Sequence, residues 1–220
     1  MKIIIINGSP RTKGFTSGIL REMEKTLEGK KVRVEYVDLS RIEMSYCQGC
    51  CVCYQIGKCH LDDDAEKLST KIKEADGVVL GSPTYASNVS GHMKTFIDRG
   101  HFVIEQLLKD KYCVTVATGE NYGNKDAAKV LNNLVLYSGG CLVKSVTVKA
   151  PFNGYKKEDV HKTAEAAAEQ LYQAVIHKRK KVVQLIYHKI IFELGIKPFV
   201  KRKGSFYKGV TDKWKELGIQ

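Results

Sequence analysis

The sequence predicts a three-layer α/β domain with a five-stranded parallel sheet and helices on both of its faces. Short apolar runs rich in β-branched residues alternate with amphipathic helical patterns over residues 1–176. The stretches between successive runs are long enough for crossovers between parallel strands. Alternation of this kind is typical of doubly wound folds, which bind ligands at the carboxyl ends of their strands.

Five apolar runs are predicted as strands. The first carries four consecutive isoleucines, which suits a strand buried on both faces, and the second alternates apolar and polar residues. The predicted strands are Lys2–Asn7, Val32–Leu39, Gly77–Pro83, Tyr112–Gly119 and Cys141–Lys149.

Five segments with apolar residues three and four positions apart are predicted as helices. In the first of them, Ile19, Leu20, Met23 and Leu27 share one side. The second begins with aspartates, which suit the positive N-terminal end of a helix. The predicted helices are Thr16–Leu27, Asp63–Ala75, His92–Leu108, Lys125–Ser138 and Lys157–Ile176.

The formal net charge of +12 is concentrated near the carboxyl end of the chain. Residues 177–220 contain twelve lysines or arginines and only three acids. We therefore divide the chain into a ligand-binding domain over residues 1–176 and a basic helical extension over residues 177–220. Because the excess charge belongs to the extension, we do not infer nucleic-acid binding from it.

Residues 182–195 of the extension have the apolar spacing of an amphipathic helix. We expect this helix to dock on its own domain or on a neighbouring subunit. The alternative is a basic amphipathic helix that lies on an anionic membrane. The apolar residues of this spacing are Val183, Ile186, Tyr187, Ile190, Ile191 and Leu194.

No part of the sequence has the composition of a membrane or secretion signal. The first apolar run has four residues, whereas a secretory signal needs about 7–15 and a membrane span about 20. We therefore expect a cytoplasmic protein with no transmembrane segment.

The loop after the first strand, Asn7–Gly18, is suited to hold a phosphate group. It supplies hydroxyls, one arginine and the N-terminus of a helix. Five residues separate Gly8 from Gly14 and Phe15 follows, so the loop is neither a Walker A motif nor a dinucleotide fingerprint. A monophosphate fits better, and the alternative is a plain turn with a helix cap.

Two further loops follow the third and fourth predicted strands. Gly81–Arg99 offers a proline, polar groups and the flat ring of Tyr85. In Ala117–Asp126, Gly119 and Gly123 permit a ligand to approach the backbone closely. Since the three strands are parallel, the three loops should meet in one crevice.

These loops resemble those of the NAD(P)H-dependent FMN reductases. The stretches that carry the resemblance are "GSPR" after the first strand and "GSPTYASNVSGHMKTFIDR" after the third. The resemblance implies a flavodoxin-like fold with strand order 2-1-3-4-5, bound FMN, NAD(P)H as co-substrate, and a homodimer or homotetramer. Because a flavin carries the hydride chemistry itself, no catalytic side chain is expected.

The resemblance also implies which residues bind FMN. The residues expected at its phosphate are Ser9, Arg11, Thr16 and Ser17. Those expected around its ring system are Pro83, Thr84, Tyr85, Asn88, Gly119 and Tyr122.

Five of the seven cysteines lie between Cys47 and Cys59. A reducing compartment disfavours disulfides, and structural zinc sites usually use two separated knuckles. Four thiolates in one compact loop suit a [4Fe–4S] cluster. Cys113 and Cys141 open predicted strands and are expected in the core.

The spacing of four of these cysteines resembles that of the iron–sulfur flavoproteins, a branch of the same flavin fold. The resemblance implies that the ligands of a [4Fe–4S] cluster are Cys47, Cys50, Cys53 and Cys59. Cys51 is left over, and other reductases of this fold carry a similar loop without a cluster.

The sequence therefore predicts an FMN-dependent NAD(P)H oxidoreductase that passes electrons between FMN and a [4Fe–4S] cluster, with a small molecule or a protein as acceptor. One alternative is a non-catalytic redox carrier or cysteine-based redox sensor with bound FMN. Others are a cluster-free NAD(P)H:FMN reductase and a zinc-stabilised binding module.

Overall fold

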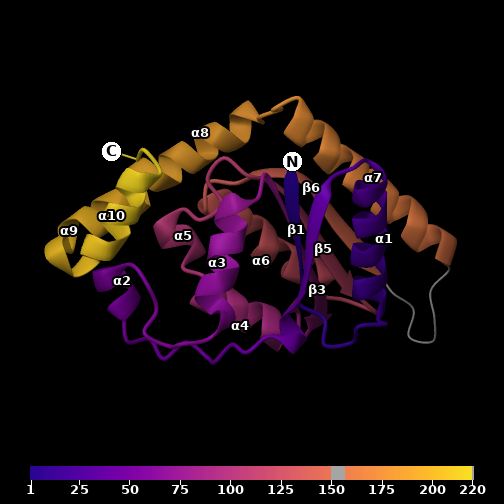
Figure 1. Cartoon of the computed structure of the whole chain (residues 1–220), viewed down its shortest axis with the longest axis horizontal. Coiled ribbons are helices and arrows are strands. Elements are labelled where there is room, and N and C mark those ends of the chain that lie inside the picture. Colours follow the sequence, from indigo (N-terminus) through magenta and orange to yellow (C-terminus); the bar gives the residue numbers. More distant parts are fainter. Residues whose placement is uncertain (150–156, 220) are drawn as a thin grey trace.

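The computed structural model describes residues 1–149 and 157–219, and a parallel sheet lies at its centre (Figure 1). The strands follow the order β2-β1-β3-β5-β6, so the predicted doubly wound fold and its strand order are confirmed. The five parallel strands are β1 (Lys2–Asn7), β2 (Arg33–Asp38), β3 (Gly77–Tyr85), β5 (Tyr112–Gly119) and β6 (Cys141–Lys149).

A short strand, β4 (Asn88–Val89), pairs antiparallel to the end of β3 and was not predicted. The turn between them places Ala86 and Ser87 in the left-handed region, with φ of 48° and 58°. These residue types rarely adopt that backbone, which is why the sequence carried no hairpin signal.

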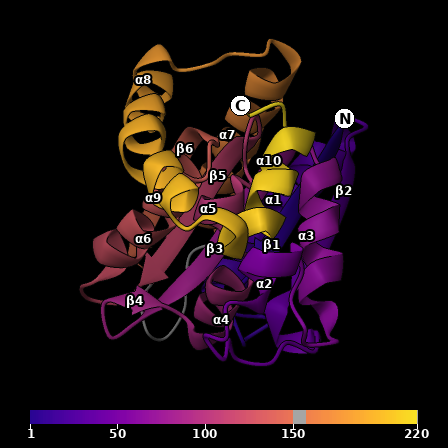
Figure 2. The ribbon, with the colours of Figure 1, turned by 90° about the vertical axis from the view of Figure 1, so that its left-hand side faces the viewer.

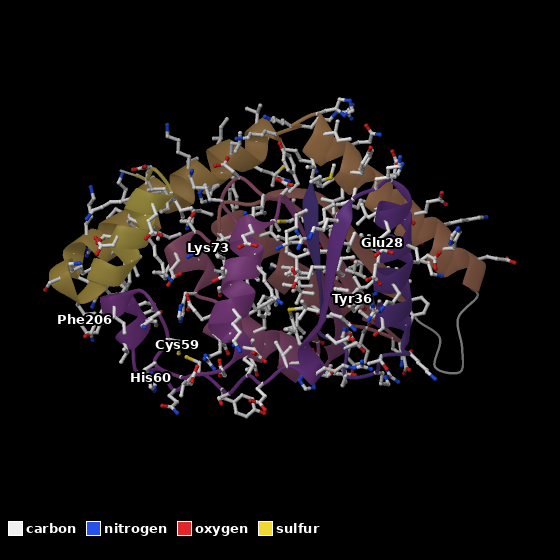
Figure 3. The ribbon with its side chains drawn as sticks, in the orientation of Figure 1. Glu28, Tyr36, Cys59, His60, Lys73 and Phe206 are labelled. Carbon is white, nitrogen blue, oxygen red and sulfur yellow. The ribbon has the colours of Figure 1, made fainter. Side chains whose placement is uncertain are left out.

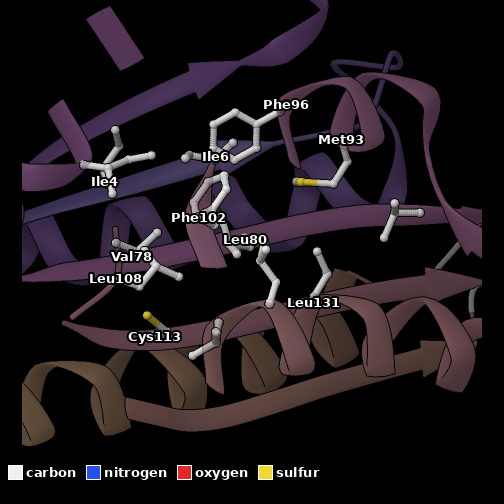
Figure 4. Packing of buried hydrophobic residues seen from close by; sticks show 14 of the residues in the cluster. Ile4, Ile6, Val78, Leu80, Met93, Phe96, Phe102, Leu108, Cys113 and Leu131 are labelled. Atoms are coloured by element: carbon white, nitrogen blue, oxygen red, sulfur yellow. The ribbon is translucent and has the colours of Figure 1, made fainter. Parts of the chain in front are cut away.

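Two helical layers cover the sheet, and the isoleucines of β1 divide between them. Ile3 and Ile5 pack in the cluster with α1 (Phe15–Gly29) and α7 (Lys157–Ile176). Ile4 and Ile6 pack in the opposite cluster (Figure 4). The helices on that side are α3 (Asp64–Glu74), α4 (Gly91–Arg99) and α6 (Asn124–Tyr137).

The single helix predicted over residues 92–108 is wrong. The structure has α4, which ends at Arg99, and the short α5 (Phe102–Glu105). His101 lies between them with φ of 47°, and the Phe102 ring occupies the space beside Gly100. Packing of Phe102 against Phe96 in the core breaks the helix there.

The long connection between β2 and α3 carries the cysteines. It contains the 3-10 turn η1 (Leu39–Arg41), an extended stretch and the short helix α2 (Val52–Ile56). Cys51 and Gly57 bound α2 with φ of 60° and 78°. Of the two cysteines predicted in the core, Cys113 is buried and Cys141 is only half-buried.

The extension leaves α7, crosses the molecule and returns to α2 (Figures 1 and 2). Its Trp214, Tyr207 and Phe192 form a small apolar cluster that includes Tyr54 of α2 and Ile104 of α5. Its elements are α8 (Val182–Ile191), the π-helical η2 (Phe192–Ile196), α9 (Lys197–Arg202), η3 (Gly204–Tyr207) and α10 (Lys208–Glu216). The division of the chain at residue 176 stays a prediction.

Helix α8 docks on its own domain with polar rather than apolar atoms. Gln184 exchanges hydrogen bonds with the backbone of Leu142 at 2.9 and 3.0 Å, and His188 Nδ1 lies 3.0 Å from the carbonyl oxygen of Leu136. The predicted apolar face is mostly exposed: Ile191 is half-buried, but Val183 is 80% exposed. The helix therefore contacts its own domain, one of the two outcomes expected for it, but leaves its apolar face mostly exposed. None of the helices in the described ranges is long and apolar enough to cross a bilayer.

Candidate functional site

The loop between β1 and α1 is fastened to the end of β3. The amide of Gly8 donates to the carbonyl of Gly81 at 2.8 Å, and the hydroxyl of Ser90 donates to the carbonyl of Gly8. A side chain at Gly8 would overlap Met93. The first two loops predicted to bind a ligand therefore form one continuous surface.

Of the four residues predicted at the phosphate, Ser9, Thr16 and Ser17 are buried, whereas Arg11 is exposed. The hydroxyl of Ser17 donates to the carbonyl of Arg11 at 2.7 Å. No side-chain hydrogen bond caps α1 at Gly14, and its first turn contains no acidic residue. This arrangement suits an anion, because the amides at a helix N-terminus attract negative charge.

Asn7 organises this loop, and no sequence pattern marked it for this role. Its buried amide donates to the Ser17 hydroxyl at 2.9 Å and to Asp38 at 2.7 Å, and its carbonyl accepts from the amide of Ser9 at 3.0 Å. A buried polar side chain that is bonded both within the loop and to Asp38 at the end of β2 fixes the loop's shape.

The third loop joins the other two through short contacts. The hydroxyls of Thr16 and Thr118 lie 2.7 Å apart, so the start of α1 is bonded to the end of β5. Gly123 has φ of 81°, and a side chain there would overlap Ser87. A Cβ atom at Gly119 would lie 3.3 Å from Thr84, a tight contact. The predicted convergence of three loops is thus present in the structure.

The residues predicted around a ring system lie on the second and third loops, Gly81–Arg99 and Ala117–Asp126. Pro83 is buried, while Asn88 is exposed, Tyr85 is 44% exposed and Tyr122 is 79% exposed. Within the described part of the chain, the buried hydroxyl of Thr84 has no hydrogen-bond partner. An unpaired buried hydroxyl and two exposed aromatic rings on these loops fit a flat ligand with polar edges.

A cleft of about 480 Å³ adjoins this surface on the side of β2. Pro10 of the first loop and Tyr85 of the second line it. Its lining also includes Met44, Ser45 and Tyr46, which come directly before the first cysteine of the predicted set. The flavin-type loops and the cysteine segment therefore share one cleft.

All seven cysteines are free thiols in the structure. Of the four predicted ligands, Cys47 and Cys50 are exposed, and Cys53 and Cys59 are half-buried. Among the residues that the structure describes, no three His, Cys, Asp or Glu side chains are gathered closely enough to hold a metal ion. The four-cysteine site stays a prediction.

The chemistry of the loop nevertheless fits an iron–sulfur group. Burial raises the pKa of the Cys53 thiol to about 12, and the neighbouring Cys59 adds to this effect. The Cys59 sulfur is therefore close enough to Cys53 to interact with it, and a bound cation would replace the protons of such thiols. The Cys50 sulfur lies 3.4 Å from Nδ1 of His60, a contact that sequence reasoning missed. Figure 3 shows Cys59 and His60 at the same end of the molecule as Phe206 of the extension.

A buried ion pair ties the cysteine loop to α4. Arg99 donates to both carboxylate oxygens of Asp63, at 2.7 and 2.9 Å, and its Nη2 lies 3.5 Å from the Cys59 sulfur. Burial opposes the charged form of Asp63, but the pKa of its carboxyl is lowered because the hydrogen bonds from Arg99 and from the amide of Ser45 outweigh burial.

The extension covers the other side of the same loop. The rings of Tyr54 and Tyr207 are stacked, with centroids 4.7 Å apart. Lys213 forms an ion pair with the buried carboxylate of Glu105 at 2.6 Å, next to Cys53. This contact could not be predicted from the sequence, since no local pattern links segments so far apart.

Comparison with known proteins was made on the whole chain. The family model for NADPH-dependent FMN reductase matches residues 1–154. A protein of Clostridioides difficile named iron–sulfur flavoprotein is 37% identical over the full length of both chains. One of that name from Archaeoglobus fulgidus is 30% identical, again over both full lengths.

Solved structures of low sequence identity share the fold. The NAD(P)H:quinone oxidoreductase from Methanothermobacter marburgensis superposes with a TM-score of 0.61 at 18% identity. The match covers 78% of this chain and 96% of that one.

Proposed function

Since the chain belongs to the NADPH-dependent FMN reductase family, in its iron–sulfur flavoprotein branch, and is an NAD(P)H-dependent flavin oxidoreductase, we propose that it passes electrons between FMN and a [4Fe–4S] cluster. One observation carries the proposal. Tyr85 of the flavin-type loops and the residues before Cys47 line the same cleft. A flavin at Tyr85 and a cluster held by the loop that begins at Cys47 would then lie near the same cleft, which suits electron transfer between them.

The first loop holds the FMN phosphate in this proposal. Ser9, Thr16 and Ser17 supply hydroxyls, the N-terminus of α1 supplies amides, and Arg11 supplies the positive charge. The exposed position of Arg11 supports this role, because its side chain is free to close over a phosphate that arrives from solvent. Asn7 keeps the loop in shape.

In this proposal the second and third loops hold the ring system of FMN. Tyr85 and Tyr122 supply aromatic surface, and the unpaired hydroxyl of Thr84 supplies a hydrogen-bonding group. When bound, FMN accepts a hydride from NAD(P)H and can release the two electrons one at a time. The chain itself binds and orients the flavin and excludes water. The remaining residues of the proposed ring site are Pro83, Asn88 and Gly119.

The cysteine loop holds the cluster, which when bound exchanges single electrons. Its ligands in this proposal are Cys47, Cys50, Cys53 and Cys59. The acceptor is then a small molecule or a protein that takes one electron at a time. Thiols of this kind persist in a reducing cytoplasm, where we place the protein. The exposed apolar face of α8 supports assembly into a homodimer or homotetramer.

The test uses the protein purified without oxygen and compares C59S with C141S. We expect C59S to lose iron but keep FMN, and C141S, outside the loop, to keep both. Steady oxidation of NADH or NADPH with an artificial acceptor should occur in the wild type. Equal iron in the two variants would contradict the ligand assignment, and no turnover would favour a redox carrier or sensor.

A further inference from the structure

Arg99 is a buried arginine in the described part of the chain that touches the cysteine loop directly. It is the last residue of α4, the helix that begins at the second flavin-type loop. Its side chain is 1% exposed. Besides Asp63, its Nη1 group donates to the carbonyl of Ser45 at 2.6 Å, and its Nη2 group donates toward the Cys59 sulfur at 3.5 Å.

Asp63 fixes this guanidinium in place. Its carboxylate is 8% exposed and also accepts from the amides of Ser45 at 3.0 Å and Ala65 at 3.1 Å. The second of these bonds caps α3. Two side chains therefore hold both ends of the cysteine loop together, since Ser45 precedes its first cysteine and Cys59 is its last.

A charged donor beside a sulfur ligand alters how readily an iron–sulfur group takes an electron. Reduction adds one negative charge, which is shared by the sulfurs. A hydrogen bond to a sulfur and a nearby positive charge both stabilise that charge, and they act more strongly where water is excluded. Asp63 carries a negative charge and has the opposite effect. The reduction potential of an iron–sulfur group at this site therefore depends on the balance between the charges of Arg99 and Asp63.

Resting on the function proposed above, we propose that Arg99 is a positioning residue that closes the base of the cysteine loop and raises the reduction potential of the iron–sulfur group there, and that Asp63 moderates this effect. In the reduction considered, one electron from dithionite enters the oxidised group and no bond to the chain is broken. Arg99 stays charged throughout, because a guanidinium is not deprotonated in proteins.

The test is a dithionite titration of the anaerobically purified holoprotein, with the midpoint of the iron–sulfur absorption as readout. R99Q removes the positive charge and should lower the midpoint. D63N keeps the shape of the cap but removes the negative charge, so it should raise the midpoint. K94Q is the matched control, since Lys94 lies on the same helix with its charge paired to Asp98 at the surface, and its midpoint should equal that of the wild type.

Opposite shifts in R99Q and D63N separate an electrostatic role from simple loosening, which would move both midpoints the same way. If R99Q retains iron with an unchanged midpoint, the redox part of the inference is wrong, and the closing role is left to the hydrogen-exchange measurement below. If R99Q loses iron, the closing role is supported. The electrostatic role is then tested by D63N, and an unchanged or lowered midpoint in D63N would overturn that role.

A second readout needs no bound iron. Amide hydrogen exchange over residues 45–63 should be faster in R99Q than in K94Q, and equal rates would overturn the closing role. Wild-type protein that never holds iron would overturn the proposed cluster, and the redox part of this inference with it. Iron in the wild type with equal midpoints in all variants would overturn the redox part alone.

Discussion

Gly209, at the start of α10, packs directly on the backbone of Gly57, the residue that ends α2. A side chain at Gly209 would overlap the backbone nitrogen of Gly57. The two residues are separated by most of the chain, yet their contact leaves no space for a methyl group. The basic extension is therefore part of the cysteine-loop structure and is not a separate arm.

We expect G209V to displace α2 and to lower the iron content while FMN binding remains. Overpacking of a tight contact costs about 1–3 kcal/mol of unfolding free energy. G195A is the matched control, because a side chain at Gly195 meets nothing within 4 Å. The ratio of iron to FMN and the thermal midpoint measure the effect, and equal ratios in the two variants would show that the contact does not shape the loop.

The hydrogen bond between Thr16 and Thr118 should support flavin binding. T118V removes one partner of this buried pair and leaves the Thr16 hydroxyl unsatisfied, at a cost of about 1–3 kcal/mol. Part of that cost should appear as a raised Kd for FMN, measured by quenching of flavin fluorescence. T147V, on an exposed position of β6, should leave the Kd unchanged. A normal Kd in T118V would mean that the loops are held without this bond.

Arg11 should bind FMN through its phosphate. R11Q removes a charge-assisted hydrogen bond, which is worth about 1.5–3 kcal/mol, so the Kd for FMN should rise by about tenfold or more. The Kd for riboflavin, which lacks the phosphate, should not change. K13Q removes an equally exposed charge from the same loop and should have a much smaller effect. If K13Q weakens FMN as much as R11Q, the attraction is general and not a specific phosphate contact.

His188 should make the stability of the chain depend on pH. Burial lowers the pKa of its imidazole below the usual value of 6.5. The unfolded chain therefore binds a proton at His188 more readily than the folded chain does. The contribution of His188 to the free energy of unfolding is fully present above pH about 6.5 and is lost as the pH falls below that value. H188Q should flatten this dependence in thermal unfolding measured from pH 5 to 7.5. If the thermal midpoints of H188Q and the wild type change with pH by the same amount, His188 is not the source of this pH dependence.

Much of the fold could be predicted because it depends on local patterns. The four isoleucines of β1 predict a strand buried on both faces, and the structure divides them between two cores. The loop Asn7–Gly18 could be predicted as a phosphate-type loop from its hydroxyls and from the helix that begins at its end. The break at His101 could not be predicted, because the packing of Phe102 imposes it against a continuous helical pattern.

The cysteine site was only half predictable. The spacing of its thiols can be read along the chain, but its supports come from distant segments. Arg99 lies 40 residues from Cys59, in the middle of the single helix predicted over residues 92–108, and no local pattern links it to the cysteines. Tyr207 and Gly209 reach the loop from the far end of the chain, and only the tertiary fold brings them there.

The central claim is that one chain holds both FMN and a [4Fe–4S] cluster. The most direct measurement is the visible absorption spectrum of protein purified without oxygen, with flavin, iron and acid-labile sulfide quantified on the same sample. The account predicts flavin bands with a broad additional shoulder, one FMN, and about four irons and four sulfides per chain. Flavin bands without iron and sulfide would contradict the cluster, and a colourless protein would contradict the flavin site as well.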